Sequence, residues 1–205
     1  MSACRAPRGL ATRRRATVLA VGATVAALSL TACGGGGTSG GSADTKFVQG
    51  KGGVDTVAKE NRKDAPQLSG KTLEGKPLDV ADYKGKIVVL NVWGSWCAPC
   101  RAEASNLAKV AKDTKAKGVR FIGINTRDSN RAPALRFEKE YGVDYPSLYD
   151  PIGKLMLRFP KGSLNPQAIP STIVLDREGR IAARALTPLS EERLRTMVTP
   201  LIAEK

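Results

Sequence analysis

The alternation of apolar and polar residues divides the chain into a leader, a polar stretch and one domain. Residues 16–30 form one apolar run, and residues 34–65 are dominated by glycine, serine and charged side chains. From residue 66 onward, short apolar runs alternate with segments in which apolar residues recur every three or four positions, the spacing of an amphipathic helix. This part, about 140 residues long, is large enough for one domain with its own core.

Buried strands and amphipathic helices are predicted in alternation within the domain. The runs at residues 86–93 and 119–126 are nearly continuously apolar and rich in β-branched residues, which is typical of strands buried on both faces of a parallel sheet. Helical periodicity predicts helices over residues 97–117 and 130–141, and a last helix capped by Ser190. Parallel crossovers are therefore expected in the first part of the domain.

Turn signals complete the predicted order of elements. Glycine-centred turns at residues 73–76 and 83–86 predict a β-hairpin that leads into the domain. Residues 146–150 are expected as a short strand or loop, residues 153–158 as a short helix, and residues 171–186 as an antiparallel hairpin. The pattern predicts an α/β fold with a central mixed sheet flanked by helices and an N-terminal β-hairpin extension.

The first 32 residues have the features of a secretory signal peptide. Five arginines and no acid precede the apolar run, which is shorter than the roughly 20 residues that a membrane-spanning helix needs. A permanent transmembrane anchor is the alternative. Residues 30–33, Leu-Thr-Ala-Cys, resemble the bacterial lipobox, in which the cysteine is acylated and becomes the first residue of the mature protein. We therefore expect a lipoprotein anchored at Cys33, on the outer side of the cell membrane.

Cleavage before Cys33 changes the cysteine count and the charge. Cys4 is then removed, Cys33 carries lipid, and Cys97 and Cys100 are the thiols that remain. The net charge falls from +14 to +9, because five arginines leave with the leader. The remaining cations are scattered singly, so we expect a solvated surface attracted to anionic lipid rather than binding to nucleic acid. Residues 33–65 are expected to be a flexible linker that reaches about 30 Å. Loose packing of Phe47, Val48, Val54 and Val57 on the domain is the alternative for its second half.

The chain contains no histidine, which excludes several kinds of site. A tetrahedral zinc site needs four Cys or His ligands, so one mature chain with two thiols cannot build it; a Cys4 site shared by two chains is the alternative. Cys-His and Ser-His catalysis are excluded as well, as is histidine-ligated copper delivery. No metal and no cofactor are expected. A structural Cys97–Cys100 disulfide would close a very small loop and restrain little of the unfolded chain.

A redox-active pair explains the Cys-x-x-Cys spacing best. Cys97 follows a buried strand at the start of a predicted helix, where free N–H groups and the helix dipole favour the thiolate. Pro99 fits the first helical turn because it has no N–H to leave unsatisfied. Cys100, one turn on, can attack the Cys97 sulfur and resolve a mixed disulfide. Trp96 is expected to form part of an apolar rim that contacts a partner peptide; a core position is the alternative.

The stretch VVLNVWGSWCAPCRAE, with GKTLEGKPLDVADYKGK before it and AIPSTIVLDREGRI after it, resembles the TlpA/ResA group of thioredoxin-fold oxidoreductases that are tethered outside the cytoplasmic membrane. The resemblance covers roughly residues 66–203 and implies a thioredoxin-like domain over residues 66–205. It implies that Cys97 is the exposed nucleophile and Cys100 the buried resolving thiol, joined as a redox-active disulfide. It further implies that Glu103 lies near the pair, that Pro170 is a cis-proline facing the disulfide, and that the Ile169 backbone meets the substrate.

Two positions depart from the pattern. Asn91 stands where thioredoxins proper carry a buried aspartate, so proton transfer would fall to Glu103. Ser105 stands where the group usually has a proline, which makes the helix less kinked and the position of Glu103 less determined. A solvated acid on the helix surface is the alternative for Glu103.

The expected activity is thiol-disulfide exchange with exported proteins. The resemblance implies reduction of disulfides, for example in apocytochrome c, with electrons from a membrane electron-transfer partner. An oxidase or isomerase is the alternative within the same enzyme class, and a thiol peroxidase fits the motif less well. A lipoprotein that uses the thioredoxin fold only for binding is the alternative outside it.

Overall fold

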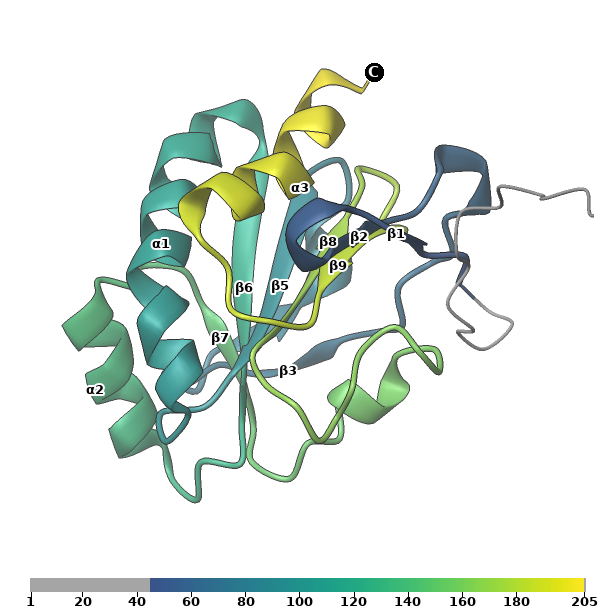
Figure 1. Cartoon of the computed structure of the whole chain (residues 1–205). Helices are drawn as coiled ribbons and strands as arrows, with labels where there is room; N and C mark the ends of the chain where they lie inside the picture. Colours follow the sequence, from purple (N-terminus) through teal and green to yellow (C-terminus); the bar gives the residue numbers. More distant parts are fainter. Residues whose placement is uncertain (1–44, 205) are drawn as a thin grey trace, which may run out of the picture. The chain divides into compact units, whose positions relative to one another are not determined.

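A computed structural model describes residues 45–204, and its centre is a seven-stranded sheet (Figure 1). The strands are β1 (Val48–Gln49), β2 (Val54–Thr56), β3 (Ser69–Lys71), β4 (Pro77–Asp79), β5 (Ile87–Trp93), β6 (Val119–Thr126), β7 (Ser147–Asp150), β8 (Ser171–Leu175) and β9 (Ile181–Ala185). The α-helices are α1 (Ala98–Thr114), α2 (Arg131–Tyr141) and α3 (Glu191–Ala203). The sheet order is β1-β2-β9-β8-β5-β6-β7, and β3 and β4 form a separate hairpin.

The sheet is mixed, as the sequence predicts. β5, β6 and β7 run parallel and are connected through α1 and α2, whereas β8, β9, β2 and β1 are antiparallel neighbours. Successive right-handed crossovers in the same direction place both helices on one face of the sheet. Figure 1 shows α1 beside α2 on that side, with α3 across the same layer.

Each face of the sheet buries its own set of side chains. On the helical face, alternate residues of β5 pack with α1 and α3; the set includes Ile87, Val89, Leu107, Val110, Leu194, Met197 and Leu201. On the other face, the intervening residues pack under the β3–β4 segment and the loop after β7; the set includes Val88, Leu90, Leu68, Val80, Leu148, Met156 and Phe159. The continuous apolar run of β5 is therefore explained by burial on both faces.

Residues 45–65 differ from the expected flexible linker. β2 pairs antiparallel with β9 at the edge of the sheet, and β1 pairs with β2. Val54 and Val57 are buried. Asp55 forms an ion pair with Arg184 of β9, with 2.8 Å between Asp55 Oδ2 and Arg184 Nε. The prediction is wrong for this part because only two buried valines are needed to cover the edge of β9, and their partner strand lies far away in the sequence.

Most predicted elements are confirmed, and one predicted helix is shorter than expected. The hairpin β3–β4, the antiparallel pair β8–β9 and the N-cap of α3 by Ser190 are present. Residues 146–150 contain a strand, β7, rather than a loop. The short helix predicted at residues 153–158 is reduced to a 3₁₀ turn at Met156–Arg158. The carboxylate of Asp150 accepts two backbone N–H groups there, and this side-chain turn competes with helix formation.

Candidate active site

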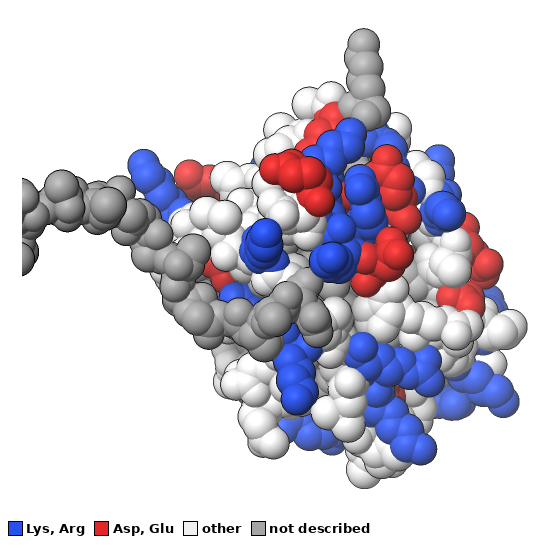
Figure 2. Space-filling model, turned by 90° about the vertical axis from the view of Figure 1, so that its right-hand side faces the viewer, with Lys and Arg blue, Asp and Glu red and all other residues white. Residues whose placement is uncertain are grey.

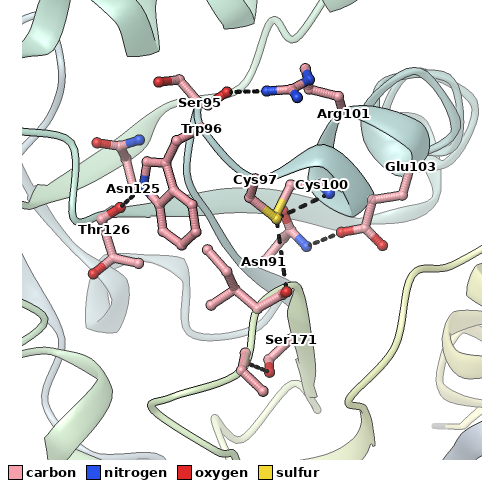
Figure 3. The surroundings of a disulfide bond; sticks show 12 residues. Asn91, Ser95, Trp96, Cys97, Cys100, Arg101, Glu103, Asn125, Thr126 and Ser171 are labelled. Atoms are coloured by element: carbon pink, nitrogen blue, oxygen red, sulfur yellow. Dashed lines mark hydrogen bonds between the residues drawn. A yellow bond between two sulfur atoms is a disulfide. The ribbon is translucent and has the colours of Figure 1, made fainter.

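The two cysteines lie where β5 passes into α1. β5 ends at Trp93, a short turn follows, and Cys97 caps the N-terminus of α1. The Cys97 Sγ accepts a hydrogen bond from the backbone N–H of Cys100 at 3.2 Å (Figure 3). Pro99 stands in the first turn, as the sequence predicts. The free N–H groups and the helix dipole favour negative charge on the Cys97 sulfur.

Cys97 and Cys100 form a disulfide, and both are buried in this state. Cys97 is 4% exposed and Cys100 is 1% exposed. The expectation of an exposed Cys97 is therefore wrong for the disulfide form. The two sulfurs pack in one cluster with Trp93 and Phe137, and Ile169 lies against that cluster.

The loop before β8 faces the disulfide. The Ile169–Pro170 peptide bond is cis, as the family resemblance implies. The carbonyl oxygen of Ile169 lies 3.8 Å from the Cys97 Sγ (Figure 3). Pro170 is buried, and β8 begins at the next residue. The Ile169 carbonyl, which precedes this proline, therefore faces the Cys97 sulfur directly.

Trp96 forms an exposed apolar surface beside the disulfide. Its side chain is 48% exposed, and its indole Nε1 donates a hydrogen bond to the Thr126 carbonyl at 3.4 Å. The guanidinium of Arg127 lies over the ring, 4.8 Å from the centroid. Trp96 is therefore a rim residue and not a core aromatic; Trp93 occupies the core position.

Asp128 holds the cysteine loop in place, a contact that the sequence did not indicate. Its carboxylate accepts hydrogen bonds from the backbone N–H of Ser95 at 2.9 Å and from the Ser95 hydroxyl at 2.5 Å. Asn125 donates a third at 2.7 Å. The position of Asp128 just after β6 is a usable signal, because functional side chains gather at the carboxyl ends of parallel strands.

Glu103 is buried under the disulfide. It is 1% exposed, and its carboxylate accepts hydrogen bonds from Asn91 Nδ2 at 2.9 Å and from the backbone N–H of Leu189 at 2.8 Å. Figure 3 shows the Asn91 amide between the sulfurs and the Glu103 carboxylate. The alternative of a solvated surface acid is wrong, and α1 is continuous through Ser105.

Burial changes the proton affinity of Glu103. Removal from water raises the pKa of the carboxyl to about 7, although the hydrogen bonds from Leu189 and Asn91 act in the opposite direction. A carboxyl with this pKa is half protonated near neutral pH and is suited to exchange protons. It shares with Cys100 the neighbouring side chain Asn91, which lines a small cavity beside that cysteine.

The structure brings six of the predicted site residues together: Trp96, Cys97, Pro99, Cys100, Ile169 and Pro170. Glu103 lies beneath them, connected through Asn91. Cys33, the predicted lipidation site, lies outside the described residues, as does the whole predicted leader.

The fold and this dithiol site define the class of the protein: it is a thioredoxin-fold thiol-disulfide oxidoreductase. The chain belongs to the AhpC/TSA family, whose model matches residues 62–184. The match includes both cysteines, Glu103 and the cis-proline.

Relatives of known name agree with this class. The chain is 35% identical over 144 residues to thiol:disulfide interchange protein HelX of Rhodobacter capsulatus, covering 69% of this chain and 76% of HelX. It is 30% identical over 132 residues to thiol-disulfide oxidoreductase ResA of Bacillus cereus, covering 64% and 73%. A secreted thiol-disulfide isomerase of Corynebacterium glutamicum superposes with a TM-score of 0.71 at 32% identity, covering 80% of this chain and all of the isomerase.

Proposed function

We propose that this protein reduces disulfides in exported proteins while a lipid on Cys33 tethers it to the outer side of the cell membrane. One observation carries the proposal: the Cys97 sulfur lies at the N-terminus of α1, facing the Ile169 carbonyl, with the half-protonated Glu103 beneath the pair. In this arrangement the Cys97 sulfur can act as the nucleophile, the Ile169 carbonyl can bind an extended substrate segment, and Glu103 can accept the proton of the resolving thiol.

The proposed reaction has two exchanges. The Cys97 thiolate attacks a substrate disulfide, which forms a mixed disulfide and releases one substrate thiolate. Cys100 then loses its proton, with Glu103 as the acceptor, and attacks the Cys97 sulfur. This step releases the second substrate thiolate and leaves the Cys97–Cys100 disulfide. Two electrons pass from the protein to the substrate, and a membrane electron-transfer partner returns them.

Docking of the substrate is assigned to four residues. The exposed Trp96 ring and the adjacent Pro99 would contact side chains of the substrate, and both lie at the protein surface. The Ile169 carbonyl, oriented by Pro170, would accept a backbone N–H of an extended substrate segment. Cysteines of apocytochrome c are one substrate that the TlpA/ResA resemblance suggests.

The tether rests on the leader sequence. Residues 30–33 match a lipobox, and within residues 45–204 no helix is long and apolar enough to cross a bilayer. Export is supported by the signal-like leader and by the likeness to a secreted isomerase.

Trapping tests the roles of the two cysteines. Cys100→Ser leaves Cys97 able to attack but removes the resolving thiol, so mixed disulfides with substrates should accumulate on non-reducing gels. Cys97→Ser is the matched control and should trap nothing. Trapping by Cys97→Ser instead would reverse the roles, and partner binding that persists without Cys97 would favour a binding lipoprotein.

An isomerase or oxidase is the second candidate, because one structural relative is named an isomerase. The reduction potential of the Cys97–Cys100 couple separates the two directions. A reductase should have a potential near the value of about −270 mV found for thioredoxin, and an oxidase one near the value of about −120 mV found for DsbA. Equilibration with glutathione or dithiothreitol buffers measures it.

A further inference from the structure

The exposed charges around the disulfide are all positive. Three segments carry or contact Trp96 and the disulfide, residues 94–101, 126–128 and 165–170, and a fourth, residues 150–154, lies beside Thr126; we call the four segments the dithiol rim. Within them, the exposed charged side chains are Arg101, Arg127 and Lys154. The two carboxylates of the rim, Asp128 and Asp150, are each only 5% exposed.

Arg127 is held directly against the docking surface. Its guanidinium lies 4.8 Å from the centre of the Trp96 ring. Its backbone is left-handed, with φ of 58°, a conformation that residues other than glycine adopt only rarely. Backbone strain of this kind gathers at functional sites. The conformation keeps a cation at the edge of the exposed indole.

The other two cations flank the same surface. Arg101, one turn after Cys97, donates to the Ser95 carbonyl at 2.7 Å (Figure 3). Lys154 follows β7, where Asp150 pairs with Thr126, and the Thr126 carbonyl accepts the Trp96 indole N–H. The backbone N–H of Lys154 donates to Asp150 at 2.9 Å, which fixes the turn.

The carboxylates of the rim are occupied by other donors. Asp128 accepts from Ser95 and Asn125, and Asp150 accepts from two backbone N–H groups of its own turn. Within residues 45–204, no ion pair joins any of the three rim cations to a carboxylate. The three cations therefore carry the exposed charge of the rim, and Asp128 and Asp150 keep their negative charge buried beneath it.

One face of the molecule shows a similar distribution of charge. Figure 2 views the molecule from the β1–β2 edge; its lower part, toward the end of the sheet where α1 begins, shows mainly lysine and arginine. The upper part shows acids and bases mixed, and ion pairs such as Arg62 with Glu204 lie near the C-terminal end of the chain. Charge separation of this kind raises the local concentration of oppositely charged partners.

We propose that the dithiol rim selects substrate segments that carry aspartate or glutamate next to the reacting disulfide. This inference rests on the proposed function and narrows its substrate class. Long-range attraction between the rim and an acidic segment would accelerate encounter, and it would weaken as salt screens the charges. The selection would therefore appear mainly in the rate of reaction at low ionic strength.

Two peptides test the inference. Each has the same two cysteines closed as a disulfide, flanked by four glutamates in one peptide and by four lysines in the other. The reduced protein, with Cys97 and Cys100 as thiols, reacts with each peptide. The rate for each peptide is divided by the rate at which dithiothreitol, which carries no charged groups beside its thiols, reduces the same peptide. This division matters because flanking lysines lower the pKa of the peptide thiols and make them better leaving groups. The acidic peptide should react about tenfold faster at low salt.

Paired variants assign the effect to the rim. The double variant Arg101→Gln/Arg127→Asn removes two rim cations; asparagine tolerates the left-handed backbone at residue 127. Its preference for the acidic peptide should fall to about twofold or less. The double variant Lys112→Gln/Lys139→Gln removes the same charge from exposed positions on α1 and α2 and should keep the preference. Arg127→Lys should also keep it.

A neutral substrate separates this inference from the proposed function. Reduction of 2-hydroxyethyl disulfide reports thiol-disulfide exchange with an uncharged substrate, and dividing the peptide rates of each variant by this rate removes any change in the reactivity of Cys97 itself. Failure to reduce this uncharged disulfide would overturn the proposed function. Normal reduction with equal normalised rates for the two peptides, or a preference that survives 0.5 M salt or loss of both rim arginines, would overturn only the selection of acidic segments.

Discussion

Glu103 is ionisable and almost completely buried, so its protonation affects the chemistry of the sulfurs. A carboxylate near the pair disfavours thiolates through like-charge repulsion, and burial strengthens this effect. We predict that Glu103→Gln lowers the apparent thiolate pKa of the reduced pair by about one unit and slows disulfide exchange. The rate of iodoacetamide alkylation against pH measures the profile of the coupled groups.

A second buried acid supplies the control. Glu138 on α2 is 7% exposed, and burial raises its pKa to about 7 as well, but its hydrogen-bond partner is Ser147 instead of Asn91. Glu138→Gln should leave the alkylation profile and the exchange rate unchanged. If the profiles of parent protein and Glu103→Gln superimpose, Glu103 has no part in the proton transfer.

Glu103 also makes stability depend on pH. Its pKa is about 7 in the folded protein and 4.5 when solvated, so the folded state binds the proton more tightly. Its contribution to stability is fully present below pH 4.5 and is lost as the pH rises to about 7, by about 3 kcal/mol in total. Urea unfolding of parent and Glu103→Gln should therefore show the variant gaining about 3 kcal/mol relative to the parent between pH 4 and pH 8. A constant difference would contradict this assignment.

At the scale of elements, β2 extends the sheet beyond β9 and forms part of the core. Val54 of β2 is 6% exposed, whereas Val48 of β1 is 62% exposed. We predict that Val54→Ala lowers the free energy of unfolding by about 1–2.5 kcal/mol, because it removes buried methyl groups and leaves a cavity. Val48→Ala should change it by less than about 0.5 kcal/mol. If both substitutions change the free energy of unfolding equally and only slightly, residues 45–57 are a linker and not part of the core.

The strand-turn-helix element around the disulfide explains why a short motif has a defined geometry. β5, a central strand of the sheet, ends at Trp93, and Cys97 is the N-cap residue of α1. The short cysteine side chain therefore places its sulfur directly at the N-terminus of the helix. The loop before β8 then adds the facing carbonyl, because β8 pairs antiparallel with β5. Two elements far apart in the chain thus form one site.

At the scale of the whole molecule, the prediction concerns membrane attachment. Two or more acyl chains on Cys33 bind a bilayer stably, because each buried CH₂ contributes about 0.8 kcal/mol. The parent protein should therefore sediment with membranes and show the added lipid in its intact mass. Cys33→Ser should lose both properties, and Cys4→Ser, which changes a cysteine in the predicted leader, should keep them. An unmodified Cys33 in the membrane fraction would exclude the lipoprotein.

The sequence by itself determined what depends on neighbours along the chain. The buried strands, the helix that begins at Cys97 and the cap at Ser190 follow from local apolar patterns and from backbone groups a few residues away. The redox pair follows as well, because its spacing within one helical turn already places the two sulfurs in reach of each other.

Only the tertiary structure decided what depends on distant residues. The family resemblance places Glu103 near the pair, but the sequence leaves a solvated helix acid open; the N–H of Leu189, 86 positions away, and the amide of Asn91 enclose the carboxylate in the core. The place of β2 depends on the open edge of β9, and the positive rim depends on Asp128 and Asp150 turning inward. The burial of a side chain and the electrostatic field around it depend on many residues that only folding brings together. A local sequence pattern therefore cannot predict them.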